Sequence, residues 1–451
     1  MANNHACARI RARENLYMGA DSAHRARRIS HSHEYKVVWF HMRILMLTSG
    51  LPHPPQQGGA LRALGILRGL HENGHSVVLL SFCDPTDNDP RTTPLADYCQ
   101  RIETIPMPHR TRTHRIRDLI LTTKPDIAGR LSSDVMRDKL RVLLTSSAFD
   151  VVQFEGIEMA IYLPFAREIV RQHRLKTHLI YDSFNAEAAL QRIIAKIETR
   201  NPRRLPAAIY STIQAGRIAR FERHICETAD TVIAVSPEDA ESLKPFRRDG
   251  KIYVVPNGIF TENYDEHPQK LDLGERVLVF TGKMDYRPNV DAALWFTDDV
   301  LPLIHADCGD TRLYIVGQKP HASLQGLREK DNIEVTGWVP DVQPYLHAAS
   351  VYVAPLRMGS GTRLKILEAM AAGCAIVATS IAASGLSEPV RQAICIADTA
   401  EDMARAVCDL LKDVTARNAL GTAAQRAVKQ YYDWSALIPS LLNTYREIGL
   451  G

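Results

Sequence analysis

The chain has 451 residues, enough for two or three domains that each bury a core. It is 45% apolar and 24% charged, which predicts a globular protein, and no run of about 18 apolar residues indicates a membrane-spanning helix. The net charge of +4 equals the excess in residues 1–41, which hold seven Lys and Arg against three acids, so the rest of the chain is balanced and gives no sign of a nucleic-acid partner.

The cysteines and the first residues bear on the compartment. The eight cysteines are scattered and none forms a CxxC pair, which favours free thiols in a reducing cytosol over a disulfide frame or a zinc site. Residues 1–41 show no periodicity, and no apolar core precedes a cleavage site, so a secretory signal is not indicated. We expect a disordered basic tail, which an upstream mis-start would explain, and a folded protein that begins at Met42.

The stretch after Met42 predicts the opening of a doubly wound α/β sheet. Residues 43–48 form an apolar strand, and residues 49–59 form a loop rich in Pro and Gly. A helix follows, ends at an Asn-Gly pair, and leads to a second strand at residues 76–82. This order of elements is typical of a Rossmann-like domain.

Two later strand patterns of this domain, DVVQF and THLIYD, end in polar side chains. These side chains are Glu155, Asp182, Asn185 and Glu187. Ligands of open α/β sheets collect at the carboxyl ends of the strands, so these residues are candidates for binding a substrate. The alternative is that they cap helices, which is the commoner use of Asp and Asn at such positions.

Three other segments of this half are less specific. Asp87-Asn88-Asp89 is similar to a metal-binding DxD motif, but it lies among prolines, and we interpret it as a turn. Residues 108–131 and 192–204 are locally basic with apolar residues between the charges, which predicts contact with an anionic membrane surface. Solvated helix faces are the alternative for both. Residues 217–229 predict a helix.

A second sheet begins after a polar hinge near residues 262–273. Its first apolar strand, residues 276–281, leads directly to Gly282 and Lys283. The most structured pattern follows at residues 350–378: a strand, a glycine loop, a helix of strong helix formers, Gly373 as a stop, and another strand.

The helix at residues 362–372 carries the clearest chemistry. The glycine loop before it offers free backbone N–H groups at a helix start, which suits a phosphate or a sugar oxygen. Lys365 and Glu368 are three residues apart and share a face, and such a cation suits a diphosphate while the carboxylate suits a ribose diol. An ordinary ion pair on a solvated helix is the alternative.

The sequence GSGTRLKILEAMAAG (residues 359–373) resembles the donor-binding motif of glycosyltransferase family 4 and its retaining GT-B relatives, and the likeness extends over residues 42–445. The resemblance implies an α/β protein of the GT-B type, with two Rossmann-like doubly wound domains facing across a cleft. The implied acceptor-side domain is 42–262, the nucleotide-sugar-binding domain is 263–430, and a helix in 431–451 crosses back to the first domain.

The resemblance also implies three groups of site residues. Those that stabilise the leaving diphosphate or bind the ribose, the catalytic group, are Lys283, Arg287, Lys365 and Glu368. The donor-binding residues are Gly58, Gly59, Gly282, Val339, Gly359, Ser360, Gly361 and Thr362. The residues on the acceptor side are Arg62, Glu155, Asp182 and Asn185.

Two positions depart from the family pattern. Ser360 stands where the first of two glutamates is usual, which bears on the contact to the sugar ring. Asn289 stands where a second diphosphate-binding cation is usual, so Arg287 or Lys365 is expected to replace it.

The function implied is transfer of a sugar, with retention, from a nucleoside diphosphate sugar to an acceptor hydroxyl in cell-surface polysaccharide or glycolipid synthesis. No metal and no further cofactor are implied; the partners are the donor, a saccharide or lipid-linked acceptor, and an anionic membrane surface on the cytoplasmic side. Two alternatives stay open: a GT-B sugar-nucleotide epimerase, and a non-catalytic protein that binds nucleotide sugars.

Overall fold

The computed structural model describes a large part of the chain. The described residues are 41–55, 58–108, 111, 122–123, 125–199, 205–264, 271–359 and 363–450. The tail predicted before Met42, much of the basic segment at 108–131, and the donor-loop residues Ser360, Gly361 and Thr362 lie outside them.

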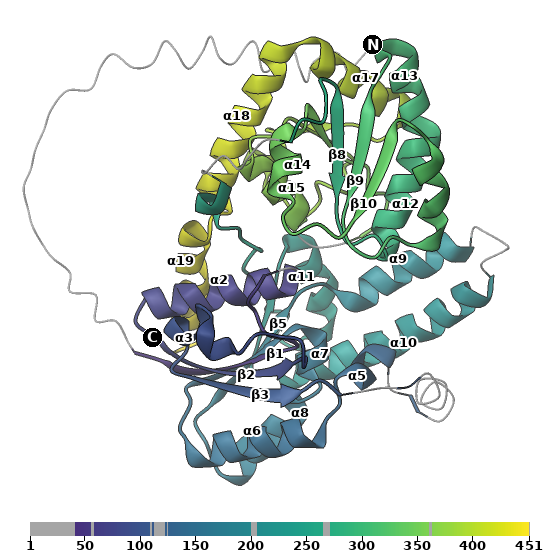
Figure 1. Cartoon of the computed structure of the whole chain (residues 1–451). Helices are drawn as coiled ribbons and strands as arrows, with labels where there is room; N and C mark the ends of the chain where they lie inside the picture. The colour runs from purple at the N-terminus through teal and green to yellow at the C-terminus, as the bar shows by residue number, and fades with distance from the viewer. Residues whose placement is uncertain are drawn as a thin grey trace, which may run out of the picture. The chain divides into compact units, whose positions relative to one another are not determined.

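The first half of the described chain forms a parallel seven-stranded sheet in the order β3-β2-β1-β4-β5-β6-β7 (Figure 1). Its strands are β1 (Arg43–Thr48), β2 (Ser76–Cys83), β3 (Arg101–Pro106), β4 (Val151–Glu155), β5 (His178–Ser183), β6 (Thr231–Ala234) and β7 (Tyr253–Val254). Ile44 of β1 pairs with both Val77 and Val151, so β1 lies where the strand order reverses. In open α/β sheets, ligands bind beyond the carboxyl ends of strands at such a point.

Helices cover both faces of this sheet. They are α2 (Gly58–Glu72), η1 (Pro90–Thr92), α3 (Leu95–Tyr98), α5 (Asp126–Arg130), α6 (Asp134–Ser146), α7 (Gly156–Ala160), α8 (Leu163–Gln172), α9 (Glu187–Thr199), α10 (Leu205–Thr228), α11 (Pro237–Leu243) and η3 (Lys244–Phe246). Strands such as β2 and β4 are mostly apolar and buried almost throughout, because a parallel sheet is covered on both faces. The turn η4 (Thr261–Tyr264) leads to the second half.

The second half has a parallel six-stranded sheet in the order β10-β9-β8-β11-β12-β13. Its strands are β8 (Val277–Thr281), β9 (Arg312–Val316), β10 (Ile333–Gly337), β11 (Val351–Ala354), β12 (Ile376–Ala378) and β13 (Cys395–Ile396). Its helices are α12 (Arg287–Trp295), η5 (Phe296–Val300), α13 (Leu301–Cys308), η6 (Ala322–Glu329), α14 (Gln343–Ala348), α15 (Leu364–Ala371), α16 (Glu388–Arg391), α17 (Ala400–Lys412) and α18 (Val414–Tyr431). The predicted pair of doubly wound α/β sheets is confirmed.

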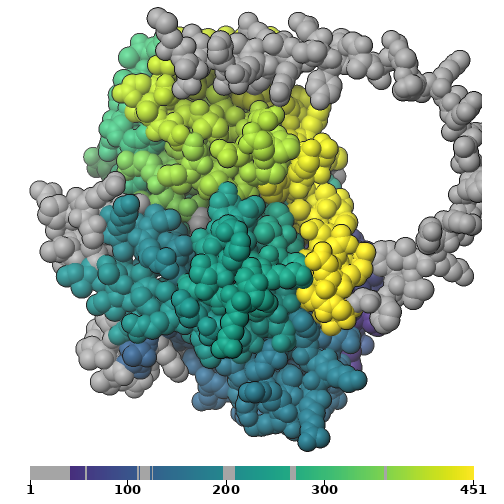
Figure 2. All heavy atoms as spheres, turned by 180° about the vertical axis from the view of Figure 1, so that it is seen from behind, coloured from purple at the N-terminus to yellow at the C-terminus, as the bar shows by residue number. Residues whose placement is uncertain are grey.

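The last helix, α19 (Trp434–Glu447), packs on α2 of the first half. Gly65 and Gly69 of α2 allow this contact: a Cβ on Gly65 would lie 1.9 Å from Trp434 Cε2, and one on Gly69 would lie 2.1 Å from Ile438 Cδ1. Figure 2 shows the yellow C-terminal residues running down onto the first half. Side chains from both ends of the chain therefore share one core.

The described residues contain no helix that is long and apolar enough to cross a membrane. The seven cysteines among them are free thiols, in agreement with the scattered spacing in the sequence.

Candidate functional site

The site in the second half begins at two glycines that end neighbouring strands. Gly282 follows β8 and Gly317 follows β9, and the Gly282 N–H donates to Val316 O at 2.9 Å. The backbones approach so closely that a Cβ on Gly317 would lie 1.6 Å from Gly282 O. A Cβ on Gly282 would lie 2.6 Å from Lys365 Nζ, so glycine leaves room for this ammonium at the end of β8.

Lys365 reaches this point from the first turn of α15. Its Nζ donates to Asn289 Oδ1 at 2.6 Å, and Asn289 Nδ2 donates in turn to Lys283 O at 2.9 Å. The ammonium also lies 4.7 Å from the centroid of the Phe280 ring. Of the two residues predicted to replace the cation missing at Asn289, the structure places Lys365 in contact with Asn289 itself.

The surroundings of Lys365 weaken its hold on a proton. Burial and, to a smaller extent, the charge of Arg363 lower the pKa of Lys365, while Glu368 acts in the opposite direction, and the resulting pKa is about 7. An anion bound beside this ammonium would restore the charged form. The group is therefore suited to a ligand that brings negative charge.

Glu368 lies one turn further along α15. Burial raises the pKa of Glu368 to about 7, against the lowering effects of Lys365 and of the Tyr264 hydroxyl. Tyr264 comes from η4, just before the second sheet. The sequence did not single out Tyr264, because no helix period or motif links it to Glu368.

The other two predicted cations are less enclosed. Lys283 is exposed, and its Nζ lies 3.7 Å from Asp285 Oδ1. Arg287 begins α12 and is partly buried, and burial lowers its pKa while Asp291 raises it. The segment after β8 thus carries two further cations, Lys283 in the loop and Arg287 at the start of α12.

The glycine loop before α15 is described up to Gly359. The φ angle of Gly359 is +134°, a conformation that favours glycine. A Cβ on Gly359 would lie 2.3 Å from a terminal nitrogen of Arg363. The predicted donor contact Val339 is partly buried against the second core.

The first half meets this loop through the start of α2. A Cβ on Gly58 would lie 3.0 Å from Leu364 Cδ1, and a Cβ on Gly59 would lie 2.8 Å from Phe184 Cε2. Burial lowers the pKa of Arg363, whereas the charges of Tyr286 and of Asp239 in α11 raise it. The predicted donor residues Gly58 and Gly59 therefore lie where the two halves come together.

Two of the predicted acceptor-side residues are buried in an ion pair. Arg62 donates from Nε and a terminal nitrogen to Asp182 at 2.9 and 2.8 Å, and to Val255 O at 2.9 Å. The exposed fractions are 1% for Arg62 and 0% for Asp182. This burial favours a structural role over direct contact with an acceptor.

Glu155 lies in the same interior and accepts a hydrogen bond from Gln153 Nε2 at 2.7 Å. Burial, together with the charge of Asp182, raises the pKa of Glu155 well above its usual range. This carboxyl group is also enclosed rather than presented to a ligand.

Asn185 and Glu187 remain partly exposed at the carboxyl end of β5. Asn185 Nδ2 donates to Glu187 Oε1 at 3.1 Å. Burial raises the pKa of Glu187 to about 7. The helix start at α9 is capped from elsewhere, because Glu222 accepts from the Glu187 N–H at 2.9 Å. Asn185 and Glu187 therefore bond to each other, and Glu222, not either of them, accepts from the first N–H groups of α9.

Two acidic or thiol clusters lie apart from this site. In the DxD-like segment, Asp87 accepts from the Asp84 N–H at 2.7 Å and Asp89 caps η1, which confirms the predicted turn.

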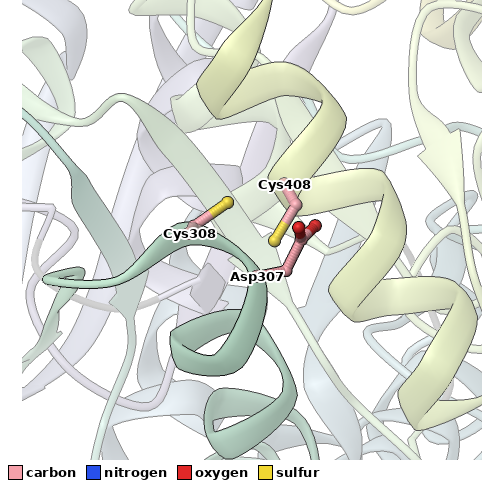
Figure 3. Close-up of side chains that lie close together, drawn as sticks. All are labelled: Asp307, Cys308 and Cys408. Carbon is pink, nitrogen blue, oxygen red and sulfur yellow. The ribbon is translucent and has the colours of Figure 1, made fainter.

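Asp307, Cys308 and Cys408 gather at the end of α13 and on α17, with ligand atoms within 4.8 Å of one another (Figure 3). The cluster offers three donors, one fewer than a closed tetrahedral zinc site needs, and Asp307 already binds Lys412 at 2.6 Å.

Comparison with known proteins agrees with this arrangement. Residues 57–263 match the family model described as glycosyltransferase family 4, and residues 275–413 match the model described as glycosyl transferases group 1. The structure is similar to a sucrose-phosphate synthase from Thermosynechococcus elongatus, with a TM-score of 0.66 and 18% identity over 90% of this chain and 99% of that one. The fold is that of GT-B glycosyltransferases.

Two relatives in sequence are informative. An uncharacterized 44.6 kDa protein in the cps region of Klebsiella pneumoniae is 19% identical over 88% of this chain and 98% of its own length. A phosphatidyl-myo-inositol mannosyltransferase of Mycobacterium leprae is 30% identical over 43% of this chain, and the match spans about half of that enzyme, 53%. The chain belongs to the group 1 glycosyl transferases of family 4, and it is a glycosyltransferase.

Proposed function

We propose that this glycosyltransferase moves a sugar from a nucleoside diphosphate sugar to an acceptor hydroxyl, with retention of configuration and without a catalytic metal ion. The observation that carries the proposal is the placement of Lys365 at Gly282, held there by Asn289. A diphosphate bound at the end of β8 would receive this ammonium at the point where negative charge develops as the sugar departs.

The other residues of the site fit the same ligand. Lys283 and Arg287 add cations in the segment after β8, and the first N–H groups of α15 have no acceptor within the helix. Together these groups neutralise the leaving diphosphate, the task that a divalent ion performs in other transferases. Glu368, one turn along, is positioned to accept hydrogen bonds from the ribose hydroxyls.

The acceptor is proposed to be a saccharide or a lipid-linked saccharide. This rests on the relatives, one of which is by name a phosphatidyl-myo-inositol mannosyltransferase and another a protein of a cps region. Such an acceptor would place the protein at the cytoplasmic face of an anionic membrane. Asn185 and Glu187 are the partly exposed polar groups at the carboxyl end of the first sheet that an acceptor hydroxyl would meet.

The epimerase alternative finds less support in the described residues. It would need several carboxylates converging on the sugar, but Glu155 and Asp182 are buried away from ligand. The non-catalytic alternative uses the same donor site as the transferase, so only a measurement of turnover distinguishes the two.

A thermal-shift screen followed by a turnover assay tests the proposal. UDP, GDP, ADP and their sugars are added to the purified protein, and one nucleotide is expected to raise the melting temperature with concentration. Lys365→Ala should move this rise to about 10- to 100-fold higher nucleotide concentration, whereas Lys330→Ala, which removes an exposed lysine before β10 that pairs with Asp298, should leave it unchanged. If none of the nucleotides stabilised the folded protein, the donor site would be wrong. Stabilisation without release of nucleotide in the presence of saccharide and lipid-linked acceptors would favour the non-catalytic alternative.

A further inference from the structure

Two cysteines that are far apart in the sequence meet where α13 and α17 pack together (Figure 3). Cys308 is the last residue of α13 and Cys408 lies within α17, and their exposed fractions are 5% and 1%. Asp307 precedes Cys308 and brings a carboxylate to the same point. The Cys408 thiol lies within hydrogen-bonding reach of both Cys308 and Asp307. Three donor groups from two helices therefore converge, although no spacing in the sequence indicated it.

This set of donors suits a zinc ion. Zn²⁺ binds thiolates and carboxylates, whereas Mg²⁺ and Ca²⁺ prefer sites made of oxygen alone. In a tetrahedral site with Zn–S bonds of about 2.3 Å, neighbouring ligand atoms lie roughly 3.5–4 Å apart. The three ligand atoms of Asp307, Cys308 and Cys408 lie within 4.8 Å of one another, so side-chain rotations are enough to bring them to one ion.

Lys412 supplies the charge that such a site requires. It lies one turn beyond Cys408 on α17, and its Nζ donates to Asp307 Oδ1 at 2.6 Å. The second carboxylate oxygen, Oδ2, can coordinate an ion while Oδ1 keeps this hydrogen bond, as carboxylate ligands of metals commonly do. Two thiolates and one carboxylate carry three negative charges, which Zn²⁺ and the Lys412 ammonium balance.

We propose that Asp307, Cys308 and Cys408 bind a Zn²⁺ ion, with a water molecule as the fourth ligand. On binding, the two thiols release their protons to the solvent and two Zn–S bonds form, with no change of oxidation state. The Asp307 side chain is 56% exposed, so the carboxylate side is open to the ion and to the water. A disulfide is a poorer fit, because an oxidant would have to reach two buried sulfurs.

The proposed zinc site lies at the edge of the second sheet opposite the donor site. Arg276, which precedes β8, donates to Cys308 O, whereas Gly282 and Gly317 follow the carboxyl ends of β8 and β9. A zinc ion here would join α13 to α17 and stabilise the second half. It would take no part in the proposed sugar transfer, which stays independent of metal.

Metal analysis of the full chain tests the proposal. Protein kept in a phosphine reductant is stripped with a chelator, loaded with zinc chloride and dialysed, and its zinc content is measured by mass spectrometry. We expect one zinc ion per chain and a rise in melting temperature, because zinc binds the folded state. Both should be lost in Cys308→Ser/Cys408→Ser. The matched control, Cys99→Ser, removes a buried thiol of the first half and should keep both.

Two milder variants keep the test valid if the double variant does not fold. Asp307→Asn changes an exposed side chain whose ion pair contributes little to stability, yet it removes a zinc ligand. Lys412→Ala removes the partner of that ligand, so competition with a chromophoric chelator should show a fall in zinc affinity of about tenfold, and a larger fall in Asp307→Asn.

Three outcomes would overturn the proposal. One is equal zinc content in the unchanged protein and in Cys308→Ser/Cys408→Ser, or no zinc in either. Another is the loss of both thiols on exposure to peroxide in protein that retains no zinc, which would make the pair a disulfide. The third is a melting-temperature rise with nucleotide that requires zinc, which would contradict a site apart from the donor. A missing nucleotide response with zinc bound would refute the donor site alone.

Discussion

The two sheets end in opposite electrostatic arrangements. Beyond the first sheet, Arg62 and Asp182 neutralise each other in the interior and share it with Glu155, a carboxyl whose pKa is raised well above its usual range. Beyond the second sheet, Lys365 and Glu368 are partly exposed, and each has a pKa of about 7. The first arrangement satisfies its charges internally, whereas the second leaves its charges partly exposed, where the proposed donor would meet them.

This difference shows that a polar residue at a strand end does not by itself mark a binding site. Arg62 and Asp182 lie where ligands bind in such sheets, yet their hydrogen bonds tie α2, β5 and the segment after β7 together. Lys365 has one hydrogen-bond acceptor among the described residues, Asn289, and stands beside a glycine. Burial and the number of hydrogen-bond partners therefore separate the charges that hold the fold from the charge that we propose meets the donor.

The largest expected effect comes from breaking the buried pair. Arg62→Ala leaves the Asp182 carboxylate buried without its partner, so the free energy of unfolding should fall by about 3–5 kcal/mol. Urea denaturation followed by circular dichroism measures it. As a control, Arg62→Met with Asp182→Leu removes both charges and should recover much of the loss. Unchanged stability in Arg62→Ala, together with weaker acceptor binding, would return Arg62 to the acceptor side.

Lys365 should show the reverse behaviour. Lys365→Ala removes a charged hydrogen bond to the proposed diphosphate, so donor affinity should fall by about 10- to 100-fold. The free energy of unfolding should not fall in parallel, because a partly desolvated cation is removed as well. Isothermal titration calorimetry with the stabilising nucleotide measures the affinity. Equal loss of affinity and stability would make Lys365 a structural residue like Arg62.

The sequence was sufficient to predict the local structure that carries Lys365 and Glu368. The motif around Lys365 and Glu368 is local, because a glycine loop and one helix turn fix its geometry, and α15 lies within the predicted helix. The contact between Lys365 and Asn289 joins residues 76 positions apart, and only the departure at Asn289 hinted at it. The sequence gave no sign of the contact between Tyr264 and Glu368 or of the burial of Arg62, because both depend on how segments distant in the sequence pack together.

A helix boundary shows the same limit. The sequence predicted a helix at residues 217–229, but α10 begins at Leu205. The added stretch contains Pro206 and Gly216, two residue types with low helix propensity. Pro206 is the second residue of the helix, where its missing N–H costs little, and contact with α9 stabilises the stretch that includes Gly216. Tertiary contact therefore overrode local propensity here.

Proton exchange on donor binding sharpens the comparison further. In the free protein the pKa of Lys365 is about 7, and a bound diphosphate raises it, so binding takes up a proton. The contribution of Lys365 to donor affinity therefore weakens as the pH rises above 7, by at most about tenfold per pH unit. The pKa of Glu368 is also about 7, and hydrogen bonds from the ribose lower it, so this contribution releases a proton and strengthens as pH rises.

Variants separate the two contributions. Calorimetry in buffers of different ionisation enthalpy should show net uptake in Glu368→Gln and net release in Lys365→Met. The release in Lys365→Met should move to higher pH, because Lys365 normally lowers the pKa of Glu368. Heats that do not depend on the buffer in either variant would contradict the assignment of both residues to the donor.

The smallest expected effect tests how Lys365 is held. Asn289→Ala removes a neutral acceptor from Lys365 and a donor to Lys283 O, and such hydrogen bonds contribute about 0.5–1.5 kcal/mol, so donor affinity should fall about 2- to 10-fold. Asn289→Lys provides the decisive contrast. In the unchanged background the new ammonium would lie against Lys365 and repel it. In Lys365→Ala it would supply the missing cation and should restore part of the lost affinity. Restoration would show that the site needs one ammonium at Gly282 and that either α12 or α15 can provide it; no restoration would mean that Lys365 acts through its own position on α15.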